Sequence, residues 1–337
     1  YAFDEEHYLC SFCPEGYLPP FGPFYPPLGV YYMKPDGERE LLAFDDWQGT
    51  GQAIPVMARR RPAVRASLVR PQDNFGVYTI QDVYQGPGLA GIARGTAKRL
   101  RVVALEYRVA RMGYGQNGGE CETGLCQTPI SLNSGSWDVK HVLGEVDIEA
   151  DGSCSFEVPA HTPVYFQVLD AKGYTIQSMR SWSTLQNGEC LSCIGCHEKR
   201  TETPKADDRD RLLRLLCTHP VDPEPVAGVP EIFDFLRDIQ PILDRHCVSC
   251  HDPTNRKGGL VLSGDRGPTY SLAYYNLLLH RQIKDHAGLK WEGIQNIGGR
   301  PGGNDAPYTA FSSAAPLMKY IEKSHYEVKL SEIERTT

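Results

Sequence analysis

The sequence predicts a multidomain fold in which an antiparallel, β-sandwich-rich N-terminal and middle region precedes a small α-helical domain. Between about residues 75 and 185, short segments rich in β-branched residues recur with turn residues between them, a pattern typical of antiparallel sandwiches. From residue 231 onward the apolar residues instead recur near helical spacing. The 337 residues leave room for two or three domains, and the apolar (41%) and charged (23%) contents are ordinary for a globular protein.

Residues 1–74 are predicted to form an irregular, Pro- and aromatic-rich lead-in that contains one β-hairpin. Proline recurs among aromatic residues at 18–27, where it fixes φ and removes backbone donors. The hairpin is expected from residues 30–33 and 41–44, with Asp36-Gly37 in the turn. Such a lead-in is also suited to wrap the surface of another subunit.

Residues 75–205 are predicted to be the β-sandwich domain, which ends in the first of two cysteine motifs. Its strands alternate or form continuous apolar runs, and the run at 163–169 is expected to be buried. The expected strands cover residues 76–80, 101–109, 142–148, 155–158, 163–169 and 174–176. The Gly-, Ser- and Asn-rich stretch 111–136 is expected to form a long surface loop.

A Pro-rich linker is predicted at 206–230, with a short helix candidate at 212–216, and the helical domain is expected over 231–337. The first helix follows the apolar residues of 232–243 and should end or kink at Pro241. Further helices are expected at 270–283 and 315–324, and a loop at 288–307.

Two copies of the pattern Cys-x-x-Cys-His stand at residues 193–197 and 247–251. This spacing is typical of covalent haem c attachment, because two thiols must reach two vinyl groups on one porphyrin edge and the next histidine then lies under the iron. The sequence therefore predicts two haem c groups. Their expected attachment residues are Cys193, Cys196 and His197 for the first, and Cys247, Cys250 and His251 for the second. Residues 231–337 are accordingly expected to be a cytochrome c domain.

Zinc is the alternative for these motifs, since Cys-x-x-Cys pairs also ligate that metal. One zinc site built from both pairs would need them to meet in a single tetrahedron, and it would not need the histidine after each pair. Chance is negligible, because this composition gives on the order of 0.01 random matches. We therefore expect haem. An additional zinc or other metal ion is a weaker expectation, for instance near Cys190, three residues before Cys193.

The second axial ligand of each iron decides whether the haem carries electrons or keeps an open face for catalysis. For the second haem, His325 is the favoured ligand and Met318 its rival; for the first, the choice stays open and His161 is the leading candidate. Weaker candidates are His280 and His286 for the second haem, and Met179, His141 and His219 for the first. Each has a structural alternative, because a lone histidine is often a surface or capping residue and a Met on an apolar strand is often core.

A net charge of −7 and a pI of about 5.8 argue against a nucleic-acid partner, which favours a basic stripe. The basic run of Arg59, Arg60, Arg61 and Arg65 fits a solvated face, or arginines that pair with haem propionates. No run of about 18 apolar residues exists, so no membrane span is expected. Because the chain starts at Tyr1 and haem c is attached outside the cytoplasm, we expect a processed or partial product that is periplasmic or extracellular.

Eleven cysteines is a high number, and four of them are assigned to haem. An oxidising compartment favours disulfides among the other seven, and Cys121 with Cys126 is the first candidate pair. Cys10 and Cys13 are close enough in sequence to pair or to bind a metal. Because seven is odd, at least one thiol is free, ligates a metal or bridges to another chain in a homo-oligomer or polymer. The seven are Cys10, Cys13, Cys121, Cys126, Cys154, Cys190 and Cys217.

Much of the chain resembles the hydrazine synthase alpha subunit family. The residues similar to the family's middle domain are 76–105, 151–153, 158–160, 165–167, 179–182 and 188–189, which lead into the first haem motif and Glu198. The family's cytochrome domain resembles residues 238–243, 247–251 and 325–331. The resemblance covers about 75–337, and it is weak over 1–70.

The resemblance implies that the middle-domain haem is the reactive one and that the C-terminal haem, held by His251 and His325, relays electrons. The sequence departs from the family in two ways. The family carries a β-propeller before this region, and none precedes it in this sequence. In the family, the motif histidine of the reactive haem turns to zinc and a tyrosine shortly after it binds the iron. Here His197 is followed by Glu198, Lys199, Arg200 and Thr201, which favours ordinary ligation by His197.

We therefore expect a di-haem c-type cytochrome that carries electrons outside the cytoplasm, in a larger complex or assembly with redox partner proteins or other subunits. The alternative is a haem redox enzyme with hydrazine synthase-like nitrogen chemistry, in which the first haem is catalytic and the second relays electrons. A scaffold subunit whose β-domain mediates binding is a third hypothesis. A five-coordinate, high-spin first haem would favour the enzyme.

Overall fold

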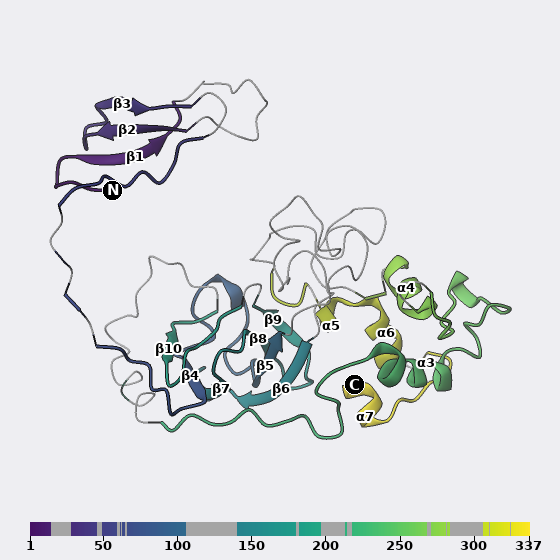
Figure 1. The fold of residues 1–337 in the computed structure, drawn as a ribbon. Helices are drawn as coiled ribbons and strands as arrows, with labels where there is room; N and C mark the ends of the chain where they lie inside the picture. Colours follow the sequence, from purple (N-terminus) through teal and green to yellow (C-terminus); the bar gives the residue numbers. More distant parts are fainter. Residues whose placement is uncertain are drawn as a thin grey trace. The chain divides into compact units, whose positions relative to one another are not determined.

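The computed structural model of this chain describes residues 1–14, 28–45, 49–58, 61, 63–64, 66–105, 140–179, 182–196, 213, 218–267, 271–280, 282–283, 306–309, 311–323 and 325–337. The loop expected at 111–136 lies outside these ranges, as do nearly all of the helix expected at 212–216 and of the loop expected at 288–307. The chain divides into two compact units, Tyr1–Ala66 and Ser67–Thr337 (Figure 1).

The first unit contains a three-stranded antiparallel sheet in the order β1-β2-β3. The hairpin expected from the sequence is confirmed, since β2 (Gly29–Met33) pairs with β3 (Arg39–Ala43). The additional strand β1 (Tyr8–Phe12) lies within the lead-in that the sequence predicts to be irregular. It forms because this stretch precedes the first proline of the chain, Pro14, so every residue keeps a backbone donor for pairing with β2.

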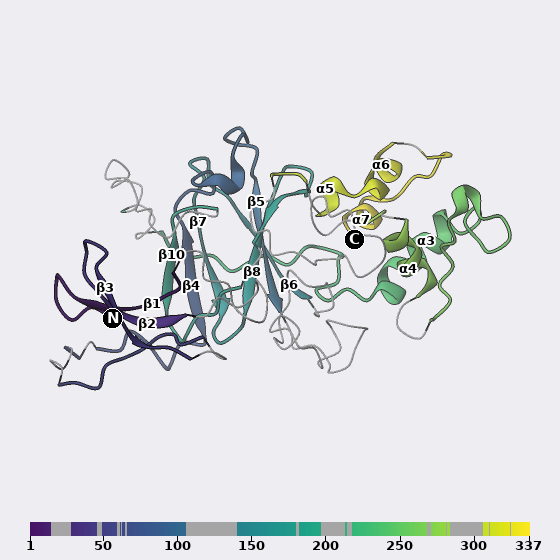
Figure 2. The ribbon, with the colours of Figure 1, turned by 90° about the horizontal axis from the view of Figure 1, so that it is seen from above.

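The second unit contains two packed sheets, with the strand orders β10-β4-β7 and β6-β5-β8-β9 (Figures 1 and 2). Their strands are β4 (Phe75–Ile80), β5 (Arg99–Leu105), β6 (Lys140–Asp147), β7 (Cys154–Pro159), β8 (Val164–Leu169), β9 (Thr175–Ser178) and β10 (Cys190–Cys193). Each strand expected from the sequence is found, although residues 106–109 of the strand expected at 101–109 lie outside the described residues. Among the described strands, the pairings are antiparallel apart from that of β10 with β4, which is parallel.

Three aromatic rings join the two sheets at the centre of the core. Tyr78 of β4 and Phe156 of β7 contact Phe166 of β8 edge to face, with ring centroids 5.0 and 5.2 Å apart. Tyr78 and Phe156 have no solvent-exposed surface. The alternation of inward apolar side chains along each strand therefore produces one continuous core between the sheets.

Replacement of Phe156 by alanine is expected to lower the free energy of unfolding by about 3–5 kcal/mol, because the ring is fully enclosed and its removal leaves a cavity. Chemical denaturation followed by near-UV circular dichroism measures the change. Leu191→Ala on the exposed face of β10 is the matched control and should cost about 0.5 kcal/mol. Equal losses for the two variants would contradict the placement of Phe156 in the core.

Short helices make up the C-terminal part of the second unit. A π-helical turn, η4 (Phe235–Ile239), runs into α3 (Gln240–His246), and Pro241 lies in the first turn of α3. The helix expected over 232–243 is therefore divided, because proline is tolerated in a first turn, where its missing N–H has no intrahelical partner. The other elements are η1 (Pro87–Leu89), η5 (Lys257–Gly259), α4 (Leu272–Leu279), α5 (Phe311–Ala314), α6 (Pro316–Glu322) and α7 (Glu332–Thr336).

Helices α3 to α7 gather on one side of the two sheets, and α5 contacts β9 directly (Figure 2). Tyr174, just before β9, donates its hydroxyl to Glu322 of α6 at 2.7 Å, and Tyr308 donates to Asp170 at 3.1 Å. The described end of the Pro-rich linker, residues 218–230, also lies along the sandwich, where Glu224 forms a bridge with Glu145 of β6. Strands and helices are thus packed into one unit.

A bilayer is about 30 Å thick, and a helix needs about 20 apolar residues to cross it. Of the helices in the described residues, none has both the length and the apolar character for that.

Candidate haem sites

The second cysteine motif continues from the end of α3 as one tight turn. Cys247 donates its N–H to Leu243 at 2.8 Å, and the N–H groups of Cys250 and His251 donate to the Cys247 carbonyl at 3.1 and 3.0 Å. The carbonyl of His251 accepts from Leu262 at 2.7 Å, which fixes the end of the turn. Both thiols and the imidazole therefore lie on one short, restrained segment, as covalent haem attachment requires.

His325, the favoured second ligand from the sequence, faces His251. The two rings are nearly parallel, with an interplanar angle of 19° and centroids 6.4 Å apart. An iron held between two imidazoles needs centroids roughly 6 Å apart, because each metal–nitrogen bond is about 2 Å long and each nitrogen lies about 1 Å from its ring centre. The spacing of this pair therefore fits the two axial ligands of one haem iron.

Apolar side chains surround the second motif, as a porphyrin requires. Cys247 and Val248 pack against a buried cluster whose members are Leu243, Leu262, Ala273 and Leu277. Burial raises the pKa of the Cys247 thiol. Within the described residues, the Nδ1 atom of His251 is buried and has no hydrogen-bond partner. A buried polar atom in that state costs about 1–3 kcal/mol.

The rivals of His325 lie elsewhere. Met318 is half-buried in α6, and no contact between it and His251 is seen among the described residues. His280 is exposed just after α4, and His286 lies outside the described residues. The structure therefore brings His251 and His325 together, and no contact of Met318 or His280 with either is seen in the described part of the chain.

The first cysteine motif begins on a sheet edge instead of a helical turn. Cys193 ends β10 and lies opposite Ile80 in the parallel pairing with β4. The loop that follows β4 holds the motif backbone: the N–H of Gln81 donates to the Cys193 carbonyl at 2.9 Å, and that of Gly88 donates to the Cys196 carbonyl at 3.2 Å. The spacing of the two thiols is therefore set by the sandwich.

Two glycines permit this close approach. A Cβ atom on Gly195 would lie 2.5 Å from the carbonyl oxygen of Gln85, and one on Gly88 would lie 2.8 Å from that of Cys196. Backbone atoms at such distances leave no room for a side chain, so the path of the first motif depends on glycine at both positions.

Both thiols of the first motif pack against the sandwich core, close to a third thiol. Ile80 of β4 lies between Cys154 of β7 on one side and Cys193 of β10 on the other. The side chains of Cys154, Ile80 and Cys193 therefore share one face of adjacent strands. Burial raises the pKa of the Cys154 thiol, which stays protonated and packs as an apolar group. The Cα atoms of Cys154 and Cys193 are two strand spacings apart, about 10 Å, which is too far for a disulfide.

The sequence gives no sign that Cys154 is a neighbour of the first motif. The signal lies in the register of β7 and β10 on either side of β4, which no local pattern encodes. His197, the predicted axial ligand, lies outside the described residues, so its role stays a prediction.

The leading candidate for the other face of the first iron is not close to Cys193. His161 follows the end of β7 that pairs with Phe75, at the opposite end of β4 from Cys193, about 17 Å away along the strand. Its Nε2 is bonded to the side-chain oxygen of Asn187 at 2.6 Å. The geometry therefore supports the capping role of His161 over iron ligation.

The weaker candidates for the first iron have other surroundings. His141, on β6, is paired with Glu231 at 2.8 Å, and His219 is exposed. Met179 is half-buried and packs against the sandwich core, the structural role that is common for a Met beside a strand. The structure brings His141 and Met179 into structural contacts, and no contact of either with the first motif is seen among the described residues.

None of the eight described cysteines forms a disulfide, including Cys10, Cys13 and Cys190. The pair Cys121 and Cys126 lies outside the described residues, as do Cys217 and most of the basic run at 59–65. In the described part of the chain, no cluster of three or more His, Cys, Asp or Glu side chains is arranged to hold a metal ion. An additional zinc ion therefore stays a prediction of the sequence.

Comparison with known proteins confirms the family resemblance. Residues 95–198, which include the first cysteine motif, match the family described as the hydrazine synthase alpha subunit middle domain. Hydrazine synthase subunit alpha of Kuenenia stuttgartiensis is 30% identical in a match that covers 50% of this chain and 26% of that protein. Among solved structures, Kuenenia stuttgartiensis hydrazine synthase matches with a TM-score of 0.45 and 18% identity, covering 81% of this chain and 44% of that chain. The chain thus spans about a quarter of the curated relative.

Proposed function

We propose that this hydrazine synthase alpha-like chain is a haem c redox subunit in which the first haem carries out hydrazine synthase-like chemistry on small nitrogen compounds and the second relays electrons to it. The observation that carries the proposal is the family match over 95–198, because it spans strands β5 to β10 of the sandwich and the first motif together. Haem supplies the redox chemistry when bound. The chain's own residues attach it, exclude water with the sandwich core and hold its axial ligands.

The two sites suit different roles. At the second site, His251 and His325 face each other at a spacing that fits two-sided ligation, which leaves no open position and favours electron transfer. At the first site, His161 and His141 are engaged with Asn187 and Glu231 instead of the motif. Ligation by His197 alone would leave the other face of the first iron open to a substrate.

A simple di-haem electron carrier is the second candidate function. The pairing of His251 with His325 favours it, as does the absence of a tyrosine in the four residues that follow His197. Coordination of the first iron separates the two functions. In both cases we propose other subunits or redox proteins as partners and a location in the periplasm or outside the cell, where haem c is attached.

The test is the haem count and spin state of the purified full chain. Intact mass and the visible spectrum should show two covalent haems, and EPR should show one high-spin and one low-spin centre. Only the high-spin centre should bind CO or NO rapidly, without displacement of a protein ligand. Two low-spin haems that bind neither gas would select the electron carrier, whereas a colourless protein would contradict both functions.

A further inference from the structure

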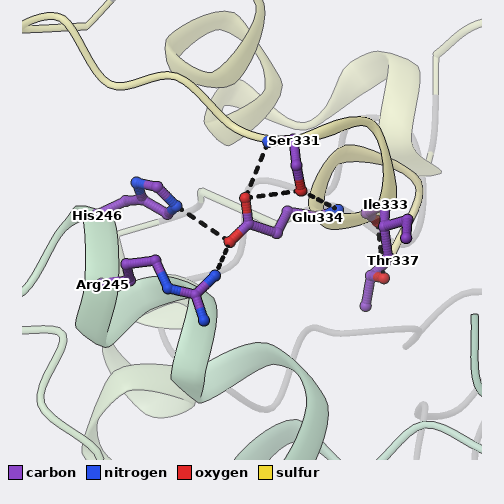
Figure 3. A network of polar contacts seen from close by, with 6 residues as sticks. All are labelled: Arg245, His246, Ser331, Ile333, Glu334 and Thr337. Carbon is purple, nitrogen blue, oxygen red and sulfur yellow. Dashed lines mark hydrogen bonds and ion pairs between the residues drawn. The ribbon is translucent and has the colours of Figure 1, made fainter. Parts of the chain in front are cut away.

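One carboxylate in the last helix joins the two segments that carry His251 and His325. Glu334 of α7 is paired with Arg245 and with His246, whose Nε2 lies 3.1 Å from Glu334 Oε1 (Figure 3). Its other oxygen accepts from the N–H and the hydroxyl of Ser331, both at 2.9 Å. The side chains of Glu334 and His246 are only 12% and 18% exposed, whereas that of Arg245 is 63% exposed, so the contact with His246 is the better shielded from water.

The partners of Glu334 are the last two residues of α3, directly before Cys247. The N–H of Cys247 is bonded to Leu243 and that of His251 to Cys247, so α3 and the haem-binding turn form one continuous hydrogen-bonded segment. The contacts of Glu334 with Arg245 and His246 therefore also hold the segment that carries His251.

His325 lies on a segment with little regular structure of its own. It follows α6 and precedes Ser331 and α7, with residues 326–330 forming no helix or strand. Tyr326 and Glu327 have left-handed φ values of 48° and 66°, and Tyr326 is 83% exposed. The ring of His325 packs edge-on against Tyr320 of α6 at 5.0 Å, so α6 holds the segment before His325, and the segment after it leads to α7. The position of His325 therefore depends on the elements at its two ends.

The charge of Glu334 is stable. The backbone N–H of Ser331, then His246 and the Ser331 hydroxyl, lower the pKa of Glu334 to about 2. The same carboxylate completes a capping box with Ser331 at the start of α7. The ionised Glu334 side chain thus both caps the start of α7 and binds α7 to α3.

We propose that Glu334 is a positioning residue of the second haem, which holds the His325 segment at α3 so that His325 stays on the iron opposite His251. This inference rests on the proposed function, since it requires a haem at the second motif. Without the contacts of Glu334 with Arg245 and His246, α7 and the turn before it would move away from α3. His325 would then leave the iron more often, while the thioether links and His251 stay in place.

The test is Glu334→Gln in the full chain, which keeps the size of the side chain and removes its charge. The rate at which CO displaces His325 from the reduced second haem should rise about tenfold, the effect expected when one charged hydrogen-bond network is lost. A high-spin fraction should also appear in the spectrum. Haem content by intact mass should stay at that of the parent chain.

Three variants separate positioning from folding. Glu332→Gln removes the same charge from the same turn of α7, and it should leave the CO rate unchanged. Ser331→Ala removes the helix cap but leaves the contacts with Arg245 and His246, so its effect should be much smaller than that of Glu334→Gln. The exchange of Arg245→Glu with Glu334→Arg should restore slow CO binding, which a general loss of stability would not.

Equal CO rates for Glu334→Gln, Glu332→Gln and the parent chain, with the haem present, would overturn the role of Glu334 and leave the proposed function intact. Absence of haem from the second motif in the parent chain would overturn the proposed function itself. Haem content and CO rate are separate measurements, so the two failures are distinguishable.

Discussion

Replacement of His325 by alanine is expected to change the second haem from a six-coordinate, low-spin centre to a five-coordinate, high-spin one. His325 faces His251 with near-parallel rings and centroids 6.4 Å apart, and alanine leaves that face of the iron without its protein ligand. The second haem should therefore bind CO rapidly, instead of at the slow rate that displacement of His325 imposes in the parent. EPR should show the loss of one low-spin signal.

Met318→Leu is the matched control, because the sequence makes Met318 the rival ligand. It should leave the spectrum unchanged, since Met318 is not seen in contact with His251 in the described part of the chain. His325→Met is a second test of the position: it should keep the iron low-spin and raise its reduction potential, as a Met ligand does relative to His. If Met318→Leu opened the iron and His325→Ala did not, Met318 would be the ligand.

Local patterns were sufficient to predict strands β4 to β9 of the sandwich and to single out His325, whose ring lies near that of His251. Strands such as β7 and β8 bury one or both faces, so their apolar residues follow the period of the pleat. His325 is predictable because it follows a helix well downstream of His251. From there the chain can fold back over a porphyrin bound at the second motif. In both cases the signal lies within a few residues.

Features that depend on distant pairing were not predictable in the same way. β1 has only five residues and no strong alternation, and it forms because β2 is there to pair with it. The parallel edge strand β10 and the approach of Cys154 to the first motif follow from the register on both sides of Ile80. The contact of Glu334 with His246 joins residues 88 positions apart, and no sequence period reports such a contact.

The two motifs share one sequence pattern but are presented by different structures. The second is a helical turn with a facing histidine, whereas the first lies on a strand edge that loop 81–88 holds in place. A relay haem needs two fixed ligands and little rearrangement, which the second site offers. A reactive haem needs an open face and a rigid support, and the rigid support is what the sandwich gives the first site.

Removal of both thiols of the first motif, by Cys193→Ala with Cys196→Ala, is expected to abolish one haem and all rapid CO binding. Intact mass should fall by one haem per chain, because no thioether link to that porphyrin remains. The low-spin signal of the second haem should persist, since Cys247, Cys250 and the facing His251 and His325 are untouched. Any turnover of nitrogen compounds should be lost with the first haem.

Cys190→Ala is the control for this double variant. Cys190 begins the same strand, is exposed and lies opposite Val77 instead of Ile80, so its removal should leave two haems and the CO-binding centre in place. Loss of one haem in the control would assign Cys190 to the attachment site. Loss of both haems in the double variant would show that the second site depends on the first, against the view that α3, α7 and their turns hold the second haem by themselves. Retained rapid CO binding after loss of the first haem would place the open iron at the second motif and reverse the roles of the two haems.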